Sequence, residues 1–546
     1  MSVTVPHEVP EETAGRFPRP PLQPLVWALF GIAALLGLVV VFLAALNPIA
    51  VTDFWWQART GEIIVRTGEI PKRDVLSWTA EGQPWVVHEW LTEVFFYYAL
   101  MYLPEWVLVA YKAGLAALAC ALVLARSWVR SGSIAVAIVA AVWAGYLVRH
   151  YADLRPQMVS FVLLAGLLLA LELYRTSRSP LLERALPWVL PPLFALWANL
   201  HGGVVVGLIL AVVWVVGDAV GAWLFDEESP ELVPLAVGVG ASLFAVLLNP
   251  NGYHVYTYPF EVLKHPEVMD FITEWYSPNF HNPAMQAFRY LLMACIGFGL
   301  LSRGRDRVRV TETLLLLAVT HAAFTAQRNT ATFGIVAAPI AAGALVSAWK
   351  APDLLAPLRE ISREPFVRAL GAATLALALG LYLIPREYPK EWIAAEQRWV
   401  KVPPDRWYEY GANLKYFPYD AVAQMRAGVN WPERAYIDYT WGGFISWMLW
   451  PQRKVFIDGR AEVYYPGKVF DDEIKLFRAQ PGWDAALERR GVQMVLTNKN
   501  GYLAAALATH PGWRKVFEGS AEVVYLPVEL VENGAPPTVP GGTVPP

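Results

Sequence analysis

The residues of this chain that could carry out chemistry are concentrated in one polar segment, residues 48–105, which follows the first long apolar run. Asp53 lies near its start, in the sequence Asp53-Phe-Trp-Trp-Gln. A carboxylate beside a membrane-like apolar run is costly unless water, a cation or a hydrogen-bond donor accompanies it. Asp53 is therefore a candidate catalytic base or metal ligand, and the alternative is that it only caps the following helix.

A second group in the same segment combines a histidine with two carboxylates. His88 and Glu89 precede an apolar stretch, and Glu93 follows Glu89 by one helical turn, so the two carboxylates share a helix face. Such a group could act as acid and base, or could hold a divalent cation such as Mg²⁺ or Mn²⁺. Glu89 is therefore a second catalytic candidate and His88 a substrate-binding candidate, although both could simply stabilise the start of the helix.

Arginines between later apolar runs are candidates for binding an anion. Arg149, Asp153 and Arg155 share one short polar segment, and Arg328 lies in another. The planar guanidinium binds two oxygens at once, which suits the phosphate of a lipid carrier. The alternative partners are Asp153 or the carboxylates of segment 48–105, which would give structural ion pairs.

Two further polar residues are candidate substrate contacts. His201 lies in the turn Asn199-Leu-His-Gly-Gly, where glycines let the chain approach a ligand closely. A lone histidine in such a turn is more often a hydrogen-bonded structural residue. Glu274 precedes Trp275 in the polar segment 249–285 and completes the set of substrate-binding candidates.

The composition indicates what kind of protein must position these residues. Of the 546 residues, 56% are hydrophobic and only 17% are charged, against about 25% charged residues in soluble domains. Long apolar runs predict an integral membrane protein with about eleven transmembrane helices. The net charge of −3 gives no indication of a nucleic-acid partner. The expected spans are 25–47, 106–125, 133–149, 157–174, 186–199, 203–224, 232–249, 286–302, 311–326, 331–348 and 368–384.

The distribution of arginine and lysine predicts the orientation in the membrane. Placing the N-terminus in the cytoplasm puts every short basic loop on the same side, as the positive-inside rule requires. The candidate site residues then share the extracytoplasmic face, and residues 88–103 form a helix that lies on that membrane surface. We therefore expect a multi-pass protein of the plasma (inner) membrane with an exported C-terminal domain.

A change in composition after Pro385 marks the start of this C-terminal domain. Charged residues become frequent, and strand-forming runs alternate with helical ones, which predicts an α/β domain over residues 385–531 with a parallel sheet closed by a hairpin. Residues 25–384 form the transmembrane domain, and the leader 1–24 and the tail 532–546 are expected to be disordered. The expected strands are Ala435–Tyr439, Lys454–Asp458, Val492–Thr497, Lys515–Glu518 and Glu522–Leu526.

Motifs in both domains carry a family resemblance. Segment 48–105 contains Asp53-Phe-Trp-Trp-Gln-Ala-Arg-Thr-Gly, Pro84-Trp and His88-Glu-Trp-Leu, and the C-terminal domain contains Trp441-Gly-Gly-Phe and Val455-Phe-Ile-Asp-Gly-Arg. With the layout of the spans, they resemble the GT-C superfamily of polytopic membrane glycosyltransferases, which includes the protein mannosyltransferase and aminoarabinose transferase types. More closely, they resemble a group of bacterial membrane proteins described as glycosyltransferase-like.

The resemblance implies an enzyme that moves a sugar from a polyprenyl-phosphate donor to a glycan, lipid or protein acceptor outside the cytoplasm. It implies that Asp53 activates the acceptor or binds a metal, with Glu89 or Asp74 as alternative bases. It also implies that the basic residues hold the lipid phosphate. The candidates for this phosphate site are Arg149, Arg155 and Arg328.

Other interpretations of the sequence remain open at this point. The motif Asp458-Gly459-Arg460 could contact an acceptor glycan, or could form a turn in which glycine supplies an unusual backbone angle. The whole protein could instead be a non-catalytic scaffold for envelope assembly. A lipid or solute transporter is a weaker alternative, because the ionisable residues gather at the outer ends of the spans rather than at the bilayer midplane.

Overall fold

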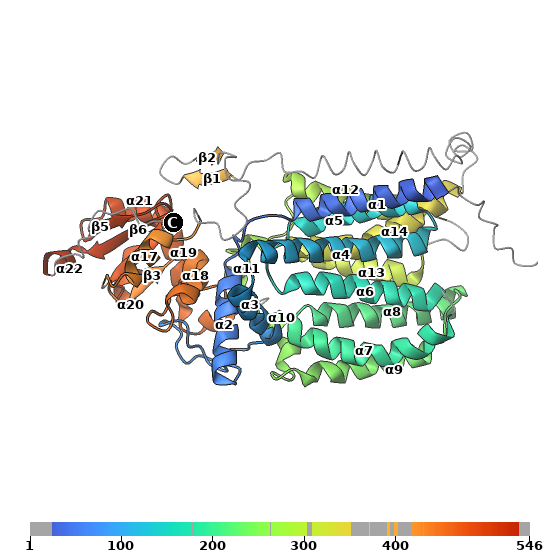
Figure 1. Ribbon diagram of the computed structural model, residues 1–546, viewed down its shortest axis with the longest axis horizontal. Helices are drawn as coiled ribbons and strands as arrows, with labels where there is room; N and C mark the ends of the chain where they lie inside the picture. The colour runs from blue at the N-terminus through green and yellow to red at the C-terminus, as the bar shows by residue number, and fades with distance from the viewer. Residues whose placement is uncertain are drawn as a thin grey trace, which may run out of the picture.

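The computed structural model describes residues 24–176, 179–261, 264–302, 308–350, 371, 390–393, 398–401, 416–429 and 431–533. Within these residues the protein is mostly helical. Long, roughly parallel helices form one part of the molecule and a small sheet with short helices forms the other, with α2 (Asp53–Thr67) and α3 (Trp90–Tyr102) between them (Figure 1). The expected span 368–384 and most of the expected leader and tail lie outside the described residues.

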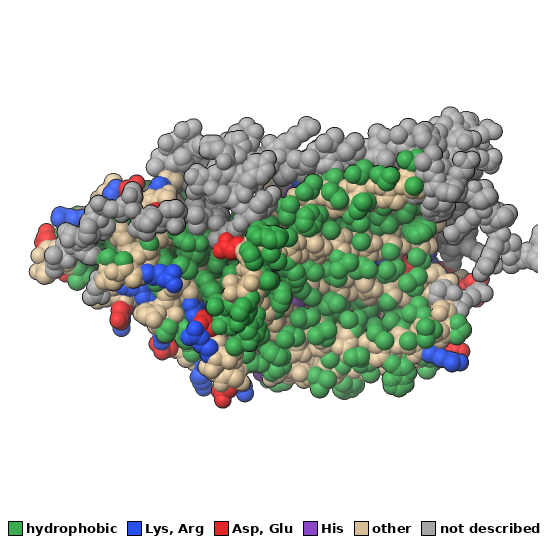
Figure 2. Space-filling view, viewed as in Figure 1, with side chains coloured by type: hydrophobic (Ala, Val, Ile, Leu, Met, Phe, Trp, Pro, Cys, Tyr) green, Lys and Arg blue, Asp and Glu red, His purple; other side chains and the backbone are tan. Residues whose placement is uncertain are grey.

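The long helices form a bundle with an apolar outer surface. Figure 2 shows hydrophobic side chains covering the visible face of the bundle, and such a surface has to face lipid. Among the described residues, four helices are long and apolar enough to cross a membrane and five apolar helices are shorter, so this is a membrane protein. The bundle contains α1 (Pro24–Ala44), α4 (Glu105–Ser131), α5 (Ile134–Arg149), α6 (Gln157–Thr176), α7 (Pro180–Leu200), α8 (Val204–Phe225), α9 (Leu232–Ala245), α12 (Pro283–Leu301), α13 (Val310–Thr325) and α14 (Thr330–Lys350).

Short sequence signals set the ends of the helices near the site. Gly68 ends α2 and Gly132 ends α4, both in the left-handed conformation (φ 73° and 67°) that glycine adopts without strain. Ser133 begins α5, because its side chain accepts a hydrogen bond from the backbone N–H of Val136. The surface helix expected over 88–103 is α3. Short helices α10 (His254–Glu261), α11 (Pro266–Met269) and η3 (Thr273–Trp275) connect the bundle to this region.

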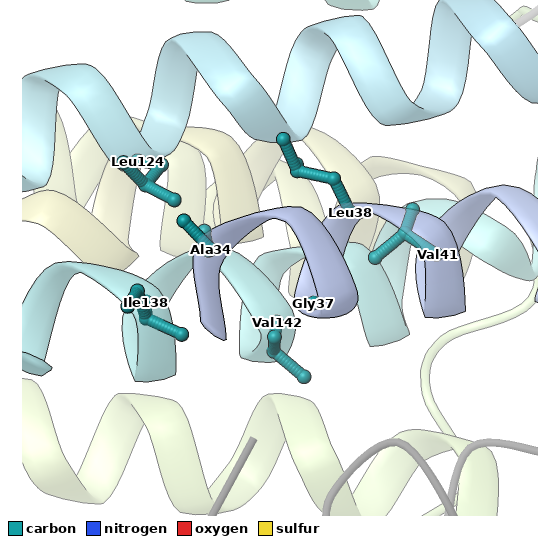
Figure 3. Close-up of a pocket in the computed structure, with 8 residues that line it drawn as sticks. Ala34, Gly37, Leu38, Val41, Leu124, Ile138 and Val142 are labelled. Atoms are coloured by element: carbon teal, nitrogen blue, oxygen red, sulfur yellow. The ribbon is translucent and has the colours of Figure 1, made fainter. Parts of the chain in front are cut away.

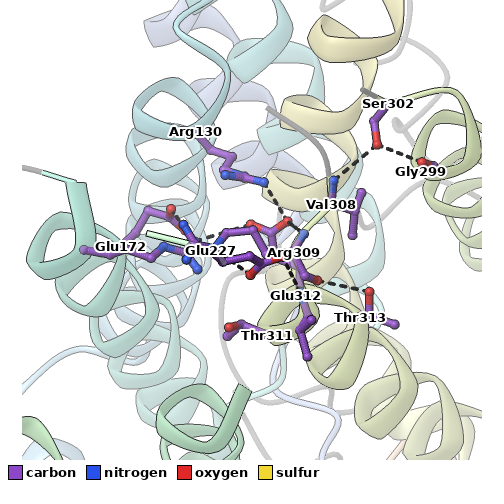
Figure 4. Close-up of polar contacts among 12 residues, drawn as sticks. Arg130, Glu172, Glu227, Gly299, Ser302, Val308, Arg309, Thr311, Glu312 and Thr313 are labelled. Carbon is purple, nitrogen blue, oxygen red and sulfur yellow. Dashed lines mark hydrogen bonds and ion pairs between the residues drawn. The ribbon is translucent and has the colours of Figure 1, made fainter. Parts of the chain in front are cut away.

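Buried ion pairs join the helices at the end of the bundle opposite to segment 48–105. Glu172 of α6 pairs with Arg175 on the same helix at 2.7 Å and with Arg126 of α4 at 3.3 Å. Glu312 of α13 pairs with Arg130 of α4 at 2.6 Å and with Arg175 at 3.3 Å (Figure 4). Removing one member of such a network leaves its partners as buried, uncompensated charges. The network therefore fixes α4, α6 and α13 against one another.

The C-terminal part contains a four-stranded sheet in the order β3-β4-β6-β5. β3 runs parallel to β4, whereas β4 pairs with β6 and β6 with β5 in antiparallel fashion. The closing hairpin is present as expected, but the sheet is mixed rather than parallel. The elements of this part are β3 (Ala435–Ile437), β4 (Met494–Asn498), β5 (Trp513–Glu518), β6 (Glu522–Pro527), α17 (Tyr419–Arg426), α18 (Tyr439–Leu449), α19 (Val469–Phe477), α20 (Trp483–Arg490), α21 (Tyr502–Ala508) and α22 (Val528–Asn533), with β1 (Lys390–Ile393) and β2 (Arg398–Lys401) as a separate pair.

The C-terminal part is attached to segment 48–105 by backbone pairing. The expected strand Lys454–Asp458 does not join the sheet, because Val455 instead bridges to segment 48–105. Its N–H donates to Leu76 O and its carbonyl accepts from Trp78 N, both at 3.0 Å. Arg59 of α2 donates to Ser446 O of α18 at 3.0 Å. Segments distant in the sequence therefore form one body around α2.

Replacing Glu172 by alanine should destabilise the protein by roughly 3–5 kcal/mol, because Arg126 and Arg175 would lose a carboxylate in a site that excludes water. Thermal unfolding of the detergent-solubilised protein, followed by tryptophan fluorescence, measures the effect. The matched control is Glu69→Ala at an exposed position, with an expected change within about 0.5 kcal/mol. Equal melting midpoints for the two variants would show that the network adds no stability.

Candidate active site

Asp53 is the first residue of α2, and two side chains hold its carboxylate. Oδ2 lies 3.1 Å from Arg155 Nε, and Oδ1 accepts a hydrogen bond from Trp56 Nε1 at 3.3 Å. The N-cap of α2 is Thr52, whose side chain makes no capping hydrogen bond. Asp53 therefore does not act as the helix cap, and its carboxylate contacts Trp56 of the same helix and the distant Arg155.

Arg155 lies between the carboxylates of Asp53 and Glu274. Its Nη1 is 2.6 Å from Glu274 Oε1. The three side chains come from α2, from the loop between α5 and α6, and from η3. Each keeps part of its surface open, with 23% of the Asp53 side chain, 18% of Arg155 and 25% of Glu274 exposed. The structure thus brings three of the predicted site residues into one triad that a bound molecule can reach.

The charges of this triad set the proton affinity of its members. Burial raises the pKa of Asp53 above its ordinary value of 3.8, while Arg155 opposes the rise and the charge of Glu274 adds to it. For Glu274, burial is outweighed by Arg155 and Arg328, which lower its pKa. Burial would lower the pKa of the Arg155 guanidinium, but its carboxylate neighbours raise it instead. Of the two carboxylates, Asp53 is therefore the better proton acceptor.

Glu89 is the centre of a second cluster next to this triad. Its Oε1 lies 3.4 Å from Nε2 of both His88 and His201, and its Oε2 accepts a hydrogen bond from Gln57 Nε2 at 3.1 Å. Gln57 follows Asp53 by one turn of α2, so the two clusters adjoin. Burial alone would raise the pKa of Glu89, but the neighbouring His88 outweighs this effect, so the pKa is lowered. The Glu89 carboxylate is therefore favoured as an anion held by two imidazoles, and it stays a candidate catalytic residue.

His201 is neutral in this cluster. Its Nδ1 accepts a hydrogen bond from the backbone N–H of Gly203 at 2.9 Å and lies 2.7 Å from Ser160 Oγ, which places the ring proton on Nε2. Burial lowers the pKa of His201 to about 4. The imidazole therefore presents an N–H toward Glu89. These hydrogen bonds are also what the structural interpretation of His201, as a residue that stabilises the turn, predicts.

The three remaining predicted site residues, Arg328, Asp153 and Arg149, differ in what they contact. Arg328 donates to Gln157 Oε1 at 3.4 Å, stacks over Trp275, and acts electrostatically on both Glu274 and Glu89. Asp153 acts on Arg155 from the same loop. Arg149 stacks over Tyr146 one turn earlier in α5, at 4.4 Å, so this contact lies within its own helix.

Several residues of this region were not among the predicted site residues. Lys112 of α4 is 1% exposed and interacts electrostatically with Asp153. Its position inside an apolar run could have marked it in the sequence as an unusual residue. The Tyr258 ring packs against His88, with ring centroids 4.0 Å apart and the planes tilted by 38°, and Tyr258 hydrogen-bonds Glu462 of the C-terminal part. No sequence signal connects Glu462 with His88, because only the folded chain brings them together.

Asp74, the alternative base, has a structural role. Its carboxylate accepts hydrogen bonds from the backbone N–H groups of Leu76 and Ser77 and binds Arg460 Nη1 at 2.7 Å. The side chain is fully enclosed. A carboxylate with all its positions occupied by donors cannot reach an acceptor hydroxyl, so Asp74 is excluded as the base.

The described residues do not form a metal site. A divalent cation needs several carboxylate or imidazole ligands around one point, and no three His, Cys, Asp or Glu side chains in the described ranges are placed in this way. Between Asp53 and Glu274, the guanidinium of Arg155 takes the place that a shared cation would need. The expected Mg²⁺ or Mn²⁺ therefore stays a prediction, and between these two carboxylates Arg155 supplies the positive charge.

An apolar crevice inside the bundle is not a second candidate site. It lies between α1, α4 and α5 (Figure 3), and it has no room for a water molecule. A Cβ at Gly37 would come within 3.1 Å of Val142, which shows how closely the helices pack there. The crevice is a packing seam between helices. Its lining residues are Ala34, Gly37, Leu38, Val41, Leu124, Ile138, Ala141 and Val142.

Replacing His201 by asparagine should flatten the pH dependence of stability. Because the folded pKa of about 4 lies below the ordinary 6.5, the unfolded chain binds a proton between these pH values that the folded chain does not. His201 therefore costs about 1.4 kcal/mol of stability for each pH unit below 6.5, down to about pH 4. Asparagine does not titrate, so this contribution should disappear from melting midpoints measured between pH 7.5 and 4.

The exposed His254 supplies the control for this measurement. His254→Asn should follow the wild-type curve. A His201→Asn curve that runs parallel to the wild type would contradict a neutral, buried His201.

Comparisons with known proteins identify the fold. No family model and no curated protein sequence matches the chain. The oligosaccharyltransferase of Archaeoglobus fulgidus matches in its apo form, and as AglB in complex with an inhibitory peptide and a dolichol-phosphate. In each case the TM-score is 0.54 at 14% identity, over 87% of this chain and 69% of the archaeal chain.

ArnT from Cupriavidus metallidurans, bound to undecaprenyl phosphate, matches with a TM-score of 0.50 and 14% identity. That match covers 92% of this chain and 98% of ArnT. At these identities the likeness concerns the fold. The chain therefore shares its overall fold with the archaeal oligosaccharyltransferase and with ArnT, as the sequence resemblance implies.

Proposed function

We propose that this protein is a membrane glycosyltransferase that moves a sugar from a polyprenyl-phosphate-linked donor to an acceptor at the extracytoplasmic face. The observation that carries the proposal is the part-exposed triad of Asp53, Arg155 and Glu274, which combines a proton acceptor with a phosphate-binding group. Proteins of the same fold were obtained with a dolichol-phosphate and with undecaprenyl phosphate. They support a lipid phosphate as the ligand here.

In the proposed reaction, Asp53 takes the proton of an acceptor hydroxyl as the oxygen attacks the anomeric carbon of the sugar. The bond between that carbon and the phosphate oxygen breaks, and its electron pair leaves with the lipid phosphate. Arg155 stabilises the negative charge that develops on the departing phosphate. The raised pKa of Asp53 favours its role as proton acceptor.

Arg155 has to exchange partners for this reaction to proceed. Its guanidinium binds both Asp53 and Glu274, and a carboxylate paired with a cation is a weaker base than a free one. A lipid phosphate that binds the Asp53 side of the guanidinium would release Asp53, while Glu274 keeps Arg155 in place. The donor would therefore bind before the acceptor is activated.

The neighbouring residues extend this site. Arg328 acts on Glu274 and Glu89 and is the second proposed phosphate ligand, and Lys112 adds a buried positive charge near Asp153. The cluster of His88, Glu89 and His201 supplies hydrogen-bonding groups for the sugar or the acceptor. Arg149, whose guanidinium lies over the Tyr146 ring, is a third proposed phosphate ligand.

We propose that the site and the C-terminal part face the outside of the cell. Arg126, Arg130 and Arg175 lie at the opposite ends of α4 and α6 from the triad. Loops rich in arginine stay in the cytoplasm during membrane insertion. The triad then meets substrates at the outer leaflet.

Replacing Asp53 by asparagine should lower sugar transfer by about 10²–10⁴-fold, because the amide keeps the size of the side chain but cannot accept the proton. Mass spectrometry of cell-surface glycans, in a strain whose only copy carries the variant, measures transfer, and immunoblotting measures protein abundance. Asp484→Asn, at an exposed carboxylate of α20, is the matched control and should keep wild-type glycans. Unchanged glycans from Asp53→Asn at normal abundance would instead favour the envelope-assembly scaffold.

The orientation can be tested with single cysteines, because the natural Cys120 and Cys295 are both buried. Asp484→Cys in the C-terminal part should react with a membrane-impermeant maleimide in intact cells. Glu183→Cys, at the opposite end of the bundle, should react only after the cells are permeabilised. The reverse pattern would place the triad in the cytoplasm and rule out an outer-face reaction.

A further inference from the structure

A turn of the C-terminal part lies directly against the carboxylate of Asp53. The turn is formed by Asp458-Gly459-Arg460, just before the 3-10 helix Ala461–Tyr464. A Cβ at Gly459 would lie 1.9 Å from Asp53 Oδ1 and 2.9 Å from Trp56 Nε1. Real Cβ atoms essentially never approach other atoms closer than 3.0 Å. Any side chain at position 459 would therefore collide with the carboxylate.

Space, and not backbone conformation, explains the glycine at this position. Gly459 is not among the glycines with positive φ, so an L-amino acid could adopt its backbone angles. The opposite holds at Gly467 and Gly482, where φ is 79° and 87° and a Cβ would meet no atom within 4 Å. This finding corrects the sequence-based explanation of the Asp-Gly-Arg motif as a turn with an unusual backbone angle.

Arg460 prevents the turn from moving aside. Its Nε and Nη2 bind the two carboxylate oxygens of Asp458 at 2.8 and 2.7 Å, and its Nη1 binds Asp74 at 2.7 Å. The guanidinium also stacks over Trp85 at 4.4 Å. Because the ion pairs are fully buried, they anchor the turn rigidly to segment 48–105.

Helix α18 of the C-terminal part also packs closely against the first turn of α2. A Cβ at Gly443 in α18 would lie 2.4 Å from Thr52 O and 3.2 Å from the Trp56 ring. Tyr439, at the start of α18, donates its hydroxyl to Gly459 O at 3.4 Å and lies close enough to Asp53 for the charge of that carboxylate to act on it. The C-terminal part therefore encloses the start of α2 from two directions.

We propose that Gly459 is a positioning residue for Asp53, and that the C-terminal part completes the catalytic site as one of its walls. The missing side chain forms a slot in which the carboxylate meets Arg155 with one oxygen and Trp56 with the other. This inference rests on the proposed function, in which Asp53 is the base. It differs from a role for the motif in binding the acceptor, because Gly459 acts through Asp53.

Gly459→Ala should reduce sugar transfer by about 100-fold, because a displacement of about 1 Å of a reacting group has an effect of that size. Undecaprenyl phosphate should still bind to the purified variant, since Arg155 and Arg328 are retained. Gly240→Ala is the matched control, because a Cβ there would meet no atom within 4 Å. Wild-type glycans from Gly459→Ala would overturn the inference, and so would loss of undecaprenyl phosphate binding, which would indicate collapse of the whole site.

A double variant tests the contact without relying on transfer. Gly459→Ala should lower the melting midpoint by about 5 °C through overpacking. In the background of Asp53→Ala, the added methyl group enters the space left by the carboxylate, so the same substitution should lower the midpoint much less. Equal shifts in both backgrounds would show that Gly459 does not constrain Asp53.

The Asp53→Asn variant separates the two ideas. If Asp53→Asn loses its glycans while Gly459→Ala keeps them, the proposed function stands and the positioning role of Gly459 is wrong. If Asp53→Asn keeps its glycans, the proposed function fails, and with it the catalytic meaning of the slot. If both variants lose their glycans, and Gly459→Ala lowers the melting midpoint less in the Asp53→Ala background, the proposed function and the positioning role of Gly459 are both supported.

Discussion

The position of one guanidinium, that of Arg155, determines how the rest of the site is organised. Asp53 and Glu274 are partly buried carboxylates, and two such charges repel each other unless a cation lies between them. Arg155 meets this need and at the same time ties α2, the α5–α6 loop and η3 together. A shared arginine holds its partners at defined distances while leaving part of each surface open. In the proposed reaction, the same guanidinium binds the lipid phosphate.

The protein has two charge networks, and their environments differ in a way that matches different roles. At the far end, Glu172, Arg175 and Glu312 are almost completely enclosed, and their charges are met by buried partners. A closed, compensated network of this kind can only hold helices together. At the site end, the triad keeps about a fifth of each side chain exposed. A ligand can therefore exchange with its internal partners, which is a condition for chemistry.

The C-terminal part is joined to the site rather than appended to it. Its backbone pairs with segment 48–105 through Val455, and Arg460 forms an ion pair with Asp74 of that segment. These contacts bring Gly459 to the carboxylate of Asp53 and Glu462 to Tyr258 and His88. These contacts give a rigid support to the start of α2 and to the loop that carries Arg155, because a loop alone does not hold a side chain to within a fraction of an ångström.

The sequence alone indicated a membrane protein with many apolar helices, and it showed which residue types near the apolar runs were chemically unusual. Asp53 could be singled out because a carboxylate beside apolar sequence is costly, Arg155 because an arginine outside the cytoplasm suits an anion, and Glu274 because it precedes a tryptophan in a polar segment. Their pairing was decided only by the tertiary structure, since more than one hundred residues separate Asp53 from Arg155 and no local pattern encodes such a contact.

The same reason explains the remaining differences between expectation and structure. Asp74 and Asp53 are both aspartates of segment 48–105. Only the folded chain shows that Asp74 is enclosed with Arg460, whereas Asp53 keeps 23% of its side chain exposed. Gly459 was visible as part of a motif, but the atom that makes a side chain impossible there belongs to Asp53. Periodicity and composition act over a few turns of helix, whereas steric exclusion and ion pairing depend on atoms that come together only on folding.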